Sequence, residues 1–228
     1  KHKLKPARVQ VDPDSINDDS KPPQTGTVFN IWYAKWSGGD SNNNHQQVHS
    51  RTRCNIKLDS GYTKADKHRL KEPIFCLYFA RGSCCMGKNC EYLHRLPTDD
   101  DLVSQTHDCF GREKFSDYRD DMGGIGNFNR INRTLYIGRI NNMSDPNVEL
   151  KISENFKQFG DIEKIRVIHE KNIAFVRYKN ELNAQFAKEA MAHQSLDRGN
   201  EKECLNVRWA NEDPDPEAQR REKRKREE

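Results

Sequence analysis

Four cysteines and one histidine lie in the short stretch CLYFARGSCCMGKNCEYLH, residues 76–94. Thiols and an imidazole this close together can hold a metal ion, form disulfides or have no joint role. Cys76, Cys84, Cys90 and His94 have the spacing C-x7-C-x5-C-x3-H. Because zinc is bound tetrahedrally by sets such as three thiolates and one imidazole, this spacing predicts a site for one zinc ion.

The adjacent thiols of Cys84 and Cys85 compete for one of the four ligand positions. Cys85 would change the first two intervals to x8 and x4. The stretch resembles CCCH zinc fingers, whose usual pattern is C-x7–9-C-x5-C-x3-H. Only Cys84 satisfies both intervals of that pattern, so the resemblance favours Cys84 as the ligand.

CCCH fingers usually bind single-stranded RNA, and the resemblance implies the same here. In such binding, aromatic side chains stack on bases and cationic side chains meet phosphates. The aromatic side chains near the ligands could instead pack around the metal, and the sequence leaves both readings open. The candidate RNA contacts of the finger are Tyr78, Phe79, Arg81, Lys88, Tyr92 and Arg95.

A second module follows the finger. Its apolar residues alternate in the manner of strands or recur at helical spacing. The resulting order, β-α-β-β-α-β, is the ferredoxin-like arrangement, which places the chain in the α+β class. The expected strands are 134–140, 161–170, 172–179 and 205–210, and the expected helices are 148–160 and 181–194.

The first and third of these strands resemble the two signatures of an RNA recognition motif. LYIGRI (135–140) has Tyr136 at the aromatic place of the shorter signature, and KNIAFVRY (171–178) follows the longer one. In that family these strands present an open sheet face. Tyr136 and Phe175 would stack on bases there and Lys171 would meet a phosphate. Arg177 and Tyr178 complete the candidate contacts of this strand.

Two positions depart from the longer signature. Asn172 stands where the family has glycine, and Ile173 replaces an aromatic residue. A platform of two aromatic residues is therefore predicted in place of three. The loss of the third also leaves open a motif that binds protein.

Composition limits the remaining possibilities. Hydrophobic residues make up 33% of the 228 and charged residues 32%, with a mean hydropathy of −1.07. A single large core is not expected, and a segment poor in apolar residues needs a metal or another staple. No apolar run is long enough to span a membrane. The net charge of +4 permits a polyanionic partner. Without a secretory signal at its start, the chain is expected in a reducing compartment, where clustered Cys and His favour metal over disulfide.

The stretches that flank the two modules resemble a more specific family. TVFNIWYAKW, DCFGREKFSDYRDDMGGIGNF and VRWANEDPDPEAQ are similar to fungal pre-mRNA-splicing factors of the NineTeen-Complex-related group. This resemblance implies a Torus domain wrapped around the finger and joined by a connector to the RNA recognition motif. The expected organisation is an extended arm (1–24), a Torus domain (25–107) with the finger (76–94), a connector (108–132), the RNA recognition motif (133–211) and a charged tail (212–228).

The connector has no helical or strand periodicity. If it is ordered, its aromatic and basic side chains could continue an RNA track between the modules, or they could only hold the modules together. These side chains are Phe110, Arg112, Lys114, Phe115, Tyr118 and Arg119. The polar loop 37–53 is expected to be mobile.

The family resemblance implies a nuclear protein of the activated spliceosome. It would contact the U6 small nuclear RNA and the pre-mRNA intron near the 5′ splice site, and it would link the NineTeen Complex to the catalytic RNA and favour the active conformation. No enzymatic activity and no small-molecule substrate are expected, because a closed four-ligand zinc leaves no position for an attacking water. The alternatives are a CCCH-type messenger-RNA stability factor and a protein-binding scaffold.

Overall fold

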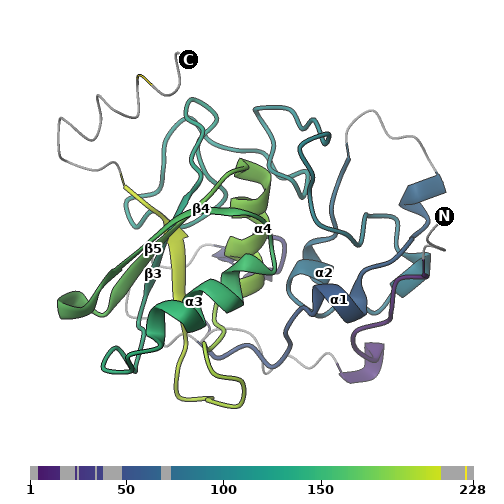
Figure 1. The fold of residues 1–228 in the computed structure, drawn as a ribbon. Coiled ribbons are helices and arrows are strands. Elements are labelled where there is room, and N and C mark those ends of the chain that lie inside the picture. Colours follow the sequence, from purple (N-terminus) through teal and green to yellow (C-terminus); the bar gives the residue numbers. More distant parts are fainter. Residues whose placement is uncertain are drawn as a thin grey trace.

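The structure is a computed structural model that describes residues 5–15, 24, 26–33, 35–37, 48–67, 73–211 and 224. The expectations for residues 38–47 of the polar loop, and for all but one residue of the tail, fall outside these ranges. The described chain forms two halves that lie side by side (Figure 1). One half contains a four-stranded sheet, and the other is largely irregular, with one two-stranded sheet, and carries the cysteine cluster.

The sheet half has the predicted β-α-β-β-α-β order. Its four strands pair antiparallel in the spatial order β4-β5-β3-β6. Figure 1 shows α3 and α4 on the same side of this sheet. The elements are β3 (Thr134–Gly138), α3 (Val148–Lys157), β4 (Ile162–Ile168), β5 (Ile173–Tyr178), α4 (Glu181–Met191) and β6 (Asn206–Trp209).

Periodicity explains the core of this half. On α3, Val148, Ile152 and Phe156 are spaced four residues apart, so they share one face and are buried together. On β3, Leu135 and Ile137 point toward the helices and have no exposed surface. Across the described ranges, none of the helices has the length and apolar character that a membrane crossing requires.

The irregular half is made of short elements joined by turns. Such elements bury little apolar surface individually, so long-range contacts must hold them in place. The elements are β1 (Val28–Asn30), β2 (Lys35–Ser37), α1 (Ile56–Asp59) and α2 (Leu77–Ala80), with 3₁₀ turns at Pro13–Ser15, Ala65–Lys67 and Gly87–Asn89. A fourth 3₁₀ turn, His169–Lys171, joins β4 to β5 in the sheet half.

Residues 5–10 form a strap across the cysteine cluster. The Ala7 amide donates to the Tyr62 carbonyl at 3.0 Å, and the Gln10 amide donates to the Cys84 carbonyl at 2.9 Å. The strap lies so close that a Cβ on Gly61 would be 2.4 Å from the Ala7 nitrogen. This part of the predicted extended arm therefore lies on the finger.

Helix α4 joins the two halves. The ring of Phe186 lies 5.9 Å from that of Phe79 and 5.8 Å from that of Phe110, both in the irregular half. It also lies 6.0 Å from the ring of Phe159 in the sheet half. The sequence predicted one apolar face on this helix, but the structure buries every residue from Asn183 to Lys188. A helix between two halves of a protein is covered on both sides. The buried residues of α4 therefore include the polar Asn183, Gln185 and Lys188 as well as the apolar face.

Candidate metal centre and nucleic-acid interface

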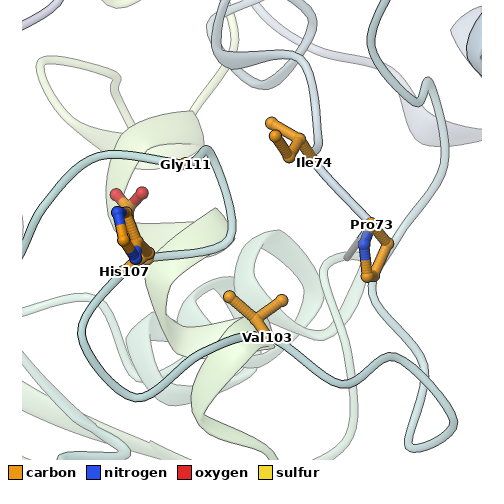
Figure 2. A pocket seen from close by; sticks show the side chains of 6 residues that line it. Pro73, Ile74, Val103, His107 and Gly111 are labelled. Atoms are coloured by element: carbon orange, nitrogen blue, oxygen red, sulfur yellow. The ribbon is translucent and has the colours of Figure 1, made fainter. Parts of the chain in front are cut away.

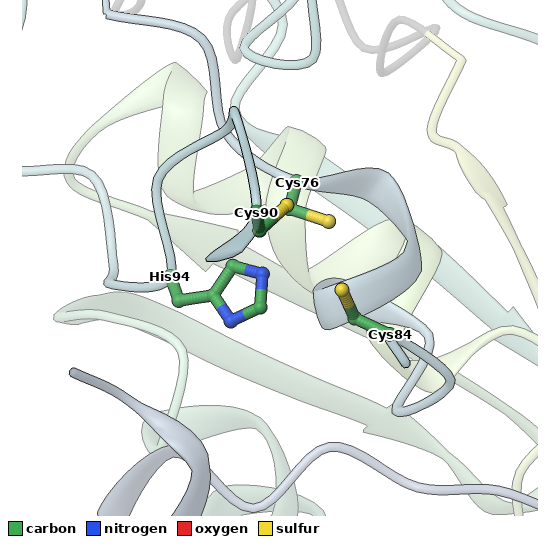
Figure 3. Close-up of side chains that lie close together, drawn as sticks. All are labelled: Cys76, Cys84, Cys90 and His94. Carbon is green, nitrogen blue, oxygen red and sulfur yellow. The ribbon is translucent and has the colours of Figure 1, made fainter. Parts of the chain in front are cut away.

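The four predicted ligands converge on one buried point. One ligand atom from each of Cys76, Cys84, Cys90 and His94 lies within 4.8 Å of the others, and Figure 3 shows the side chains pointing toward a common space. All four residues are buried. Cys85 is partly exposed and lies outside the cluster.

Hydrogen bonds to neighbouring segments place three of the four ligands. Cys76 caps the N-terminus of α2, and its Sγ accepts from the Phe79 amide at 3.3 Å. The Cys84 amide donates to the side-chain oxygen of Gln10 at 2.9 Å. The carbonyl of His94 accepts from the Gly61 amide at 3.1 Å. The cluster is thus held by the strap, by α2 and by the segment that follows α1.

The donor set fits a metal ion. Both ring nitrogens of His94 are buried and have no hydrogen-bond partner among the described residues, which is costly unless something else satisfies one of them. Hydrogen bonds from the thiols of Cys76 and Cys90 lower the pKa of Cys84 well below its ordinary value. Three cysteine thiols and one imidazole are the donor set that a cation of the zinc type selects.

The open face of the sheet carries an aromatic pair. Tyr136 on β3 is the direct register partner of Phe175 on β5, and their ring centroids are 5.8 Å apart at an interplanar angle of 68°. The pair continues outward to Arg166 on β4 and to Arg208 on β6. Residues directly opposite each other share a face, so two cations flank two aromatic rings in one row.

The two departures from the longer signature have different structural consequences. Asn172 has a φ of +54°, a left-handed conformation that glycine adopts freely and asparagine tolerates. Asn172 therefore preserves the turn that precedes β5. Ile173 lies on the open face opposite Ile168. An aliphatic side chain therefore occupies the place where the family has its third aromatic ring.

Three aromatic residues that were predicted as RNA contacts are not available to a base. Tyr178 points to the helix side and is fully buried, and its hydroxyl donates to the Phe156 carbonyl at 2.8 Å. Phe79 is buried against His94, with ring centroids 4.6 Å apart and an angle of 14°. Phe110 is buried beside α4. The prediction of RNA contact by these three side chains was wrong, because all three are fully buried; for Phe79 and Phe110 the alternative, packing, holds.

Several predicted phosphate contacts are engaged in ion pairs. Arg81 and Arg112 both bind Glu189 at 2.9 Å, and Lys114 binds Glu181 at 3.0 Å. Arg95 holds both oxygens of Asp101 at 2.6 Å. Arg112 and Lys114 are buried, so the structure contradicts a surface role for them and supports the alternative in which the connector holds the modules together.

The remaining candidates lie at the surface or at its edge. Phe115 is 57% exposed, and Tyr78 and Tyr92 are each 39% exposed. Arg177 is half-buried on the open face, where its Nε donates to Glu163 at 3.1 Å. Lys88, Lys171 and Arg119 are exposed, whereas Tyr118 is half-buried and packs against the core.

Sequence reasoning missed the flanking cations Arg166 and Arg208. Once the strand register is known, the residues directly opposite Phe175 and Tyr136 must lie on the same sheet face. These residues are Arg166 and Arg208. The Arg208 side chain also donates to the Asp121 carbonyl at 2.8 Å, so the connector borders the open face along β6.

A hollow of about 170 Å³ is lined by Pro73 and Ile74 on one segment and by His107 and Gly111 on a loop. Figure 2 shows these lining residues from close by. Asp108 is the one carboxylate in its lining. Both Asp108 oxygens accept hydrogen bonds, from the backbone amides of Phe110 and Arg112 and from the Arg112 side chain. This carboxylate therefore stabilises the connector.

The fold and the site together define a class. The Torus domain family matches residues 2–112, and the RNA recognition motif family matches residues 139–200. A chain with a Torus domain, a Cys3His cluster and this motif is a multidomain protein of RNA-binding architecture. The matched Torus range includes the strap and the first residues of the predicted connector.

Full-length comparison is more specific. The pre-mRNA-splicing factor CWC2 of Yarrowia lipolytica is 59% identical over 227 residues, which cover 97% of this chain and 58% of that protein. The pre-mRNA-splicing factor cwc2 of Aspergillus fumigatus is 58% identical over 100% of this chain and 53% of its own. The pre-mRNA-splicing factor cwf2 of Schizosaccharomyces pombe is 55% identical over 100% and 57%.

This chain belongs to the same family of fungal pre-mRNA-splicing factors. It spans just over half the length of the three relatives.

Proposed function

We propose that this chain is a non-enzymatic RNA-binding splicing factor that acts in the nucleus. The observation that carries the proposal is the Tyr136–Phe175 pair on the open sheet face, with Arg166 and Arg208 in the same row. Aromatic rings flanked by cations suit single-stranded RNA, whose bases can stack on the rings and whose phosphates need positive charge. The names of the relatives direct this activity to pre-mRNA splicing.

The cysteine cluster is proposed to hold one zinc ion through Cys76, Cys84, Cys90 and His94. When bound, the ion fixes the finger in place and has no open position for catalysis. The exposed Tyr78 and Tyr92 would then be presented to RNA beside a rigid centre.

The two binding surfaces are proposed to act together. Because α4 is buried between the halves, the finger and the sheet are held at a defined separation. A second contact on the same RNA is then intramolecular, which raises its effective concentration. The proposed targets are the U6 small nuclear RNA and the pre-mRNA intron near the 5′ splice site. Through them the protein would link the NineTeen Complex, with other spliceosomal proteins, to the catalytic RNA and promote its active conformation.

Ultraviolet crosslinking in assembled spliceosomes, with the adducts mapped by mass spectrometry, tests this function. Adducts of U6 or intron sequence are expected on Tyr136, Phe175 and at least one of Tyr78 and Tyr92. Adducts from mature messenger RNA alone would favour a stability factor. If no peptide of the finger or the sheet carries an RNA adduct in complexes that contain the protein, the protein-binding scaffold is the remaining function.

A further inference from the structure

A second hollow lies on the seam between the two halves, away from the open sheet face. Residues 49–55 of the irregular half cross the loop between α4 and β6 there, and the Gln194 side chain donates to the Thr52 carbonyl at 2.7 Å. The hollow has a volume of about 240 Å³. A water molecule in liquid occupies about 30 Å³, so a group larger than one water fits.

The lining of this hollow is cationic. Three guanidinium groups, those of Arg51, Arg53 and Arg198, contribute to it, and no Asp or Glu is among the lining residues that the structure describes. Burial lowers the pKa of Arg53, and the nearby charge of Arg198 lowers it further. The like charges of Arg53 and Arg198 are therefore close together, with no carboxylate in the described part of the lining.

Arg53 is held in place by the sheet half. Its Nη1 donates to the Ser195 carbonyl at 2.9 Å, and its Nη2 donates to Asn155 Oδ1. Its Nε is buried and has no partner among the described residues. Nε2 of His49, also in the lining, is buried without a partner as well. A buried donor without an acceptor costs about 1–3 kcal/mol.

We propose that this hollow binds a phosphate group, and that the phosphate is a backbone phosphodiester of the bound RNA. An anion seated between Arg53 and Arg198 would relieve their repulsion and give the Arg53 Nε–H an acceptor. Guanidinium and phosphate form strong charge-assisted hydrogen bonds of matching geometry. The choice of RNA as the source of the phosphate rests on the function proposed above, whereas the phosphate chemistry rests on the lining alone.

The test observes the unpartnered donor directly. In the full chain, the nitrogen–hydrogen NMR signal of Arg53 Nε is followed during titration with a single-stranded oligoribonucleotide and, separately, with inorganic phosphate. RNA is expected to shift this signal at far lower concentration than phosphate does. Arg198→Gln is expected to weaken RNA binding several-fold and to flatten the salt dependence of log affinity by about 0.7. Lys157→Gln removes an exposed cation on α3, away from the hollow, and is expected to leave both quantities unchanged.

The outcomes separate this proposal from the proposed function. If Tyr136→Ala weakens RNA binding while the Arg53 signal does not move and Arg198→Gln is neutral, the hollow is no RNA site and the general function stands. If inorganic phosphate shifts the signal and RNA does not, the RNA source is overturned in favour of a small phosphate. If the chain binds no RNA, both the function and the RNA assignment fail.

Discussion

Arg112 of the connector donates from Nη2 to Oε1 of Glu189 on α4 at 2.9 Å, and little of either side chain is exposed. Burial alone would raise the pKa of Glu189, but the charges of Arg112 and Arg81 hold it well below its ordinary value. One carboxylate of α4 thereby ties α2 and the connector to the sheet half. The RNA-binding surfaces on the two halves keep their relative position because of contacts like this one.

Glu189→Gln is expected to destabilise the folded chain by about 3 kcal/mol, because it leaves buried guanidinium charge without its partner. Urea unfolding at neutral pH measures the change. Glu154→Gln on the exposed side of α3 is the matched control and should have little effect. Equal stability of the two variants would show that the pair contributes nothing to the joint.

The same carboxylate predicts a dependence on pH. Its pKa is depressed in the folded state, so its stabilisation is fully present above the ordinary glutamate pKa, about 4.3. The stabilisation is lost as pH falls toward the lower folded value. The difference in unfolding free energy between the wild type and Glu189→Gln should therefore be constant near neutrality and shrink below about pH 4. A difference that grows on acidification would contradict the depressed pKa.

Cys84→Ser and Cys85→Ser form a matched pair at the metal site. Metal analysis of the purified chain should give about one zinc ion for the wild type and for Cys85→Ser, and a large loss for Cys84→Ser, because only the Cys84 thiol reaches the cluster. The thermal midpoint should fall with the metal. Retention of zinc by Cys84→Ser together with its loss from Cys85→Ser would reverse the assignment.

Tyr136→Ala and Phe175→Ala should each weaken RNA binding by about 1–3 kcal/mol, since each removes one stacking surface. A fluorescence binding titration measures this. Tyr178→Phe is the control on the same strand, because it deletes only a buried hydroxyl that bonds to Phe156. It should lower stability by about 1 kcal/mol without changing affinity. Unchanged affinity in both alanine variants would remove the stacking platform.

Gln10→Ala tests the strap as a support for the metal site. The Gln10 side-chain oxygen accepts a hydrogen bond from the Cys84 amide at 2.9 Å, and its nitrogen donates to the buried carboxylate of Asp59 at 3.0 Å. Supports of this kind affect metal affinity by about 10- to 100-fold, so zinc should be lost to a competing chelator more readily. Gln105→Ala, at an exposed position, should behave as wild type. A wild-type zinc affinity in Gln10→Ala would make the strap irrelevant to the metal.

The sequence by itself determined the features that depend on local spacing. The intervals between Cys76, Cys90 and His94 are set by the chain itself, and the resemblance to CCCH fingers favoured Cys84 over Cys85 as the fourth ligand. The order of strands and helices could be predicted because periods of 2 and 3.6 residues are local. The resemblance to an RNA recognition motif predicted that Tyr136 and Phe175 share the open face, and the register of β3 with β5 places them opposite each other.

Only the tertiary structure decided which of the remaining candidates reach solvent. Phe79, Phe110 and Arg112 have the residue types of RNA contacts, yet α4 covers them from more than 70 positions away in the chain. The meeting of Arg53 with Arg198 and the strap over Cys84 likewise join distant segments. Periodicity reports which way a side chain points, but burial depends on what packs above it, and that is a property of the whole fold.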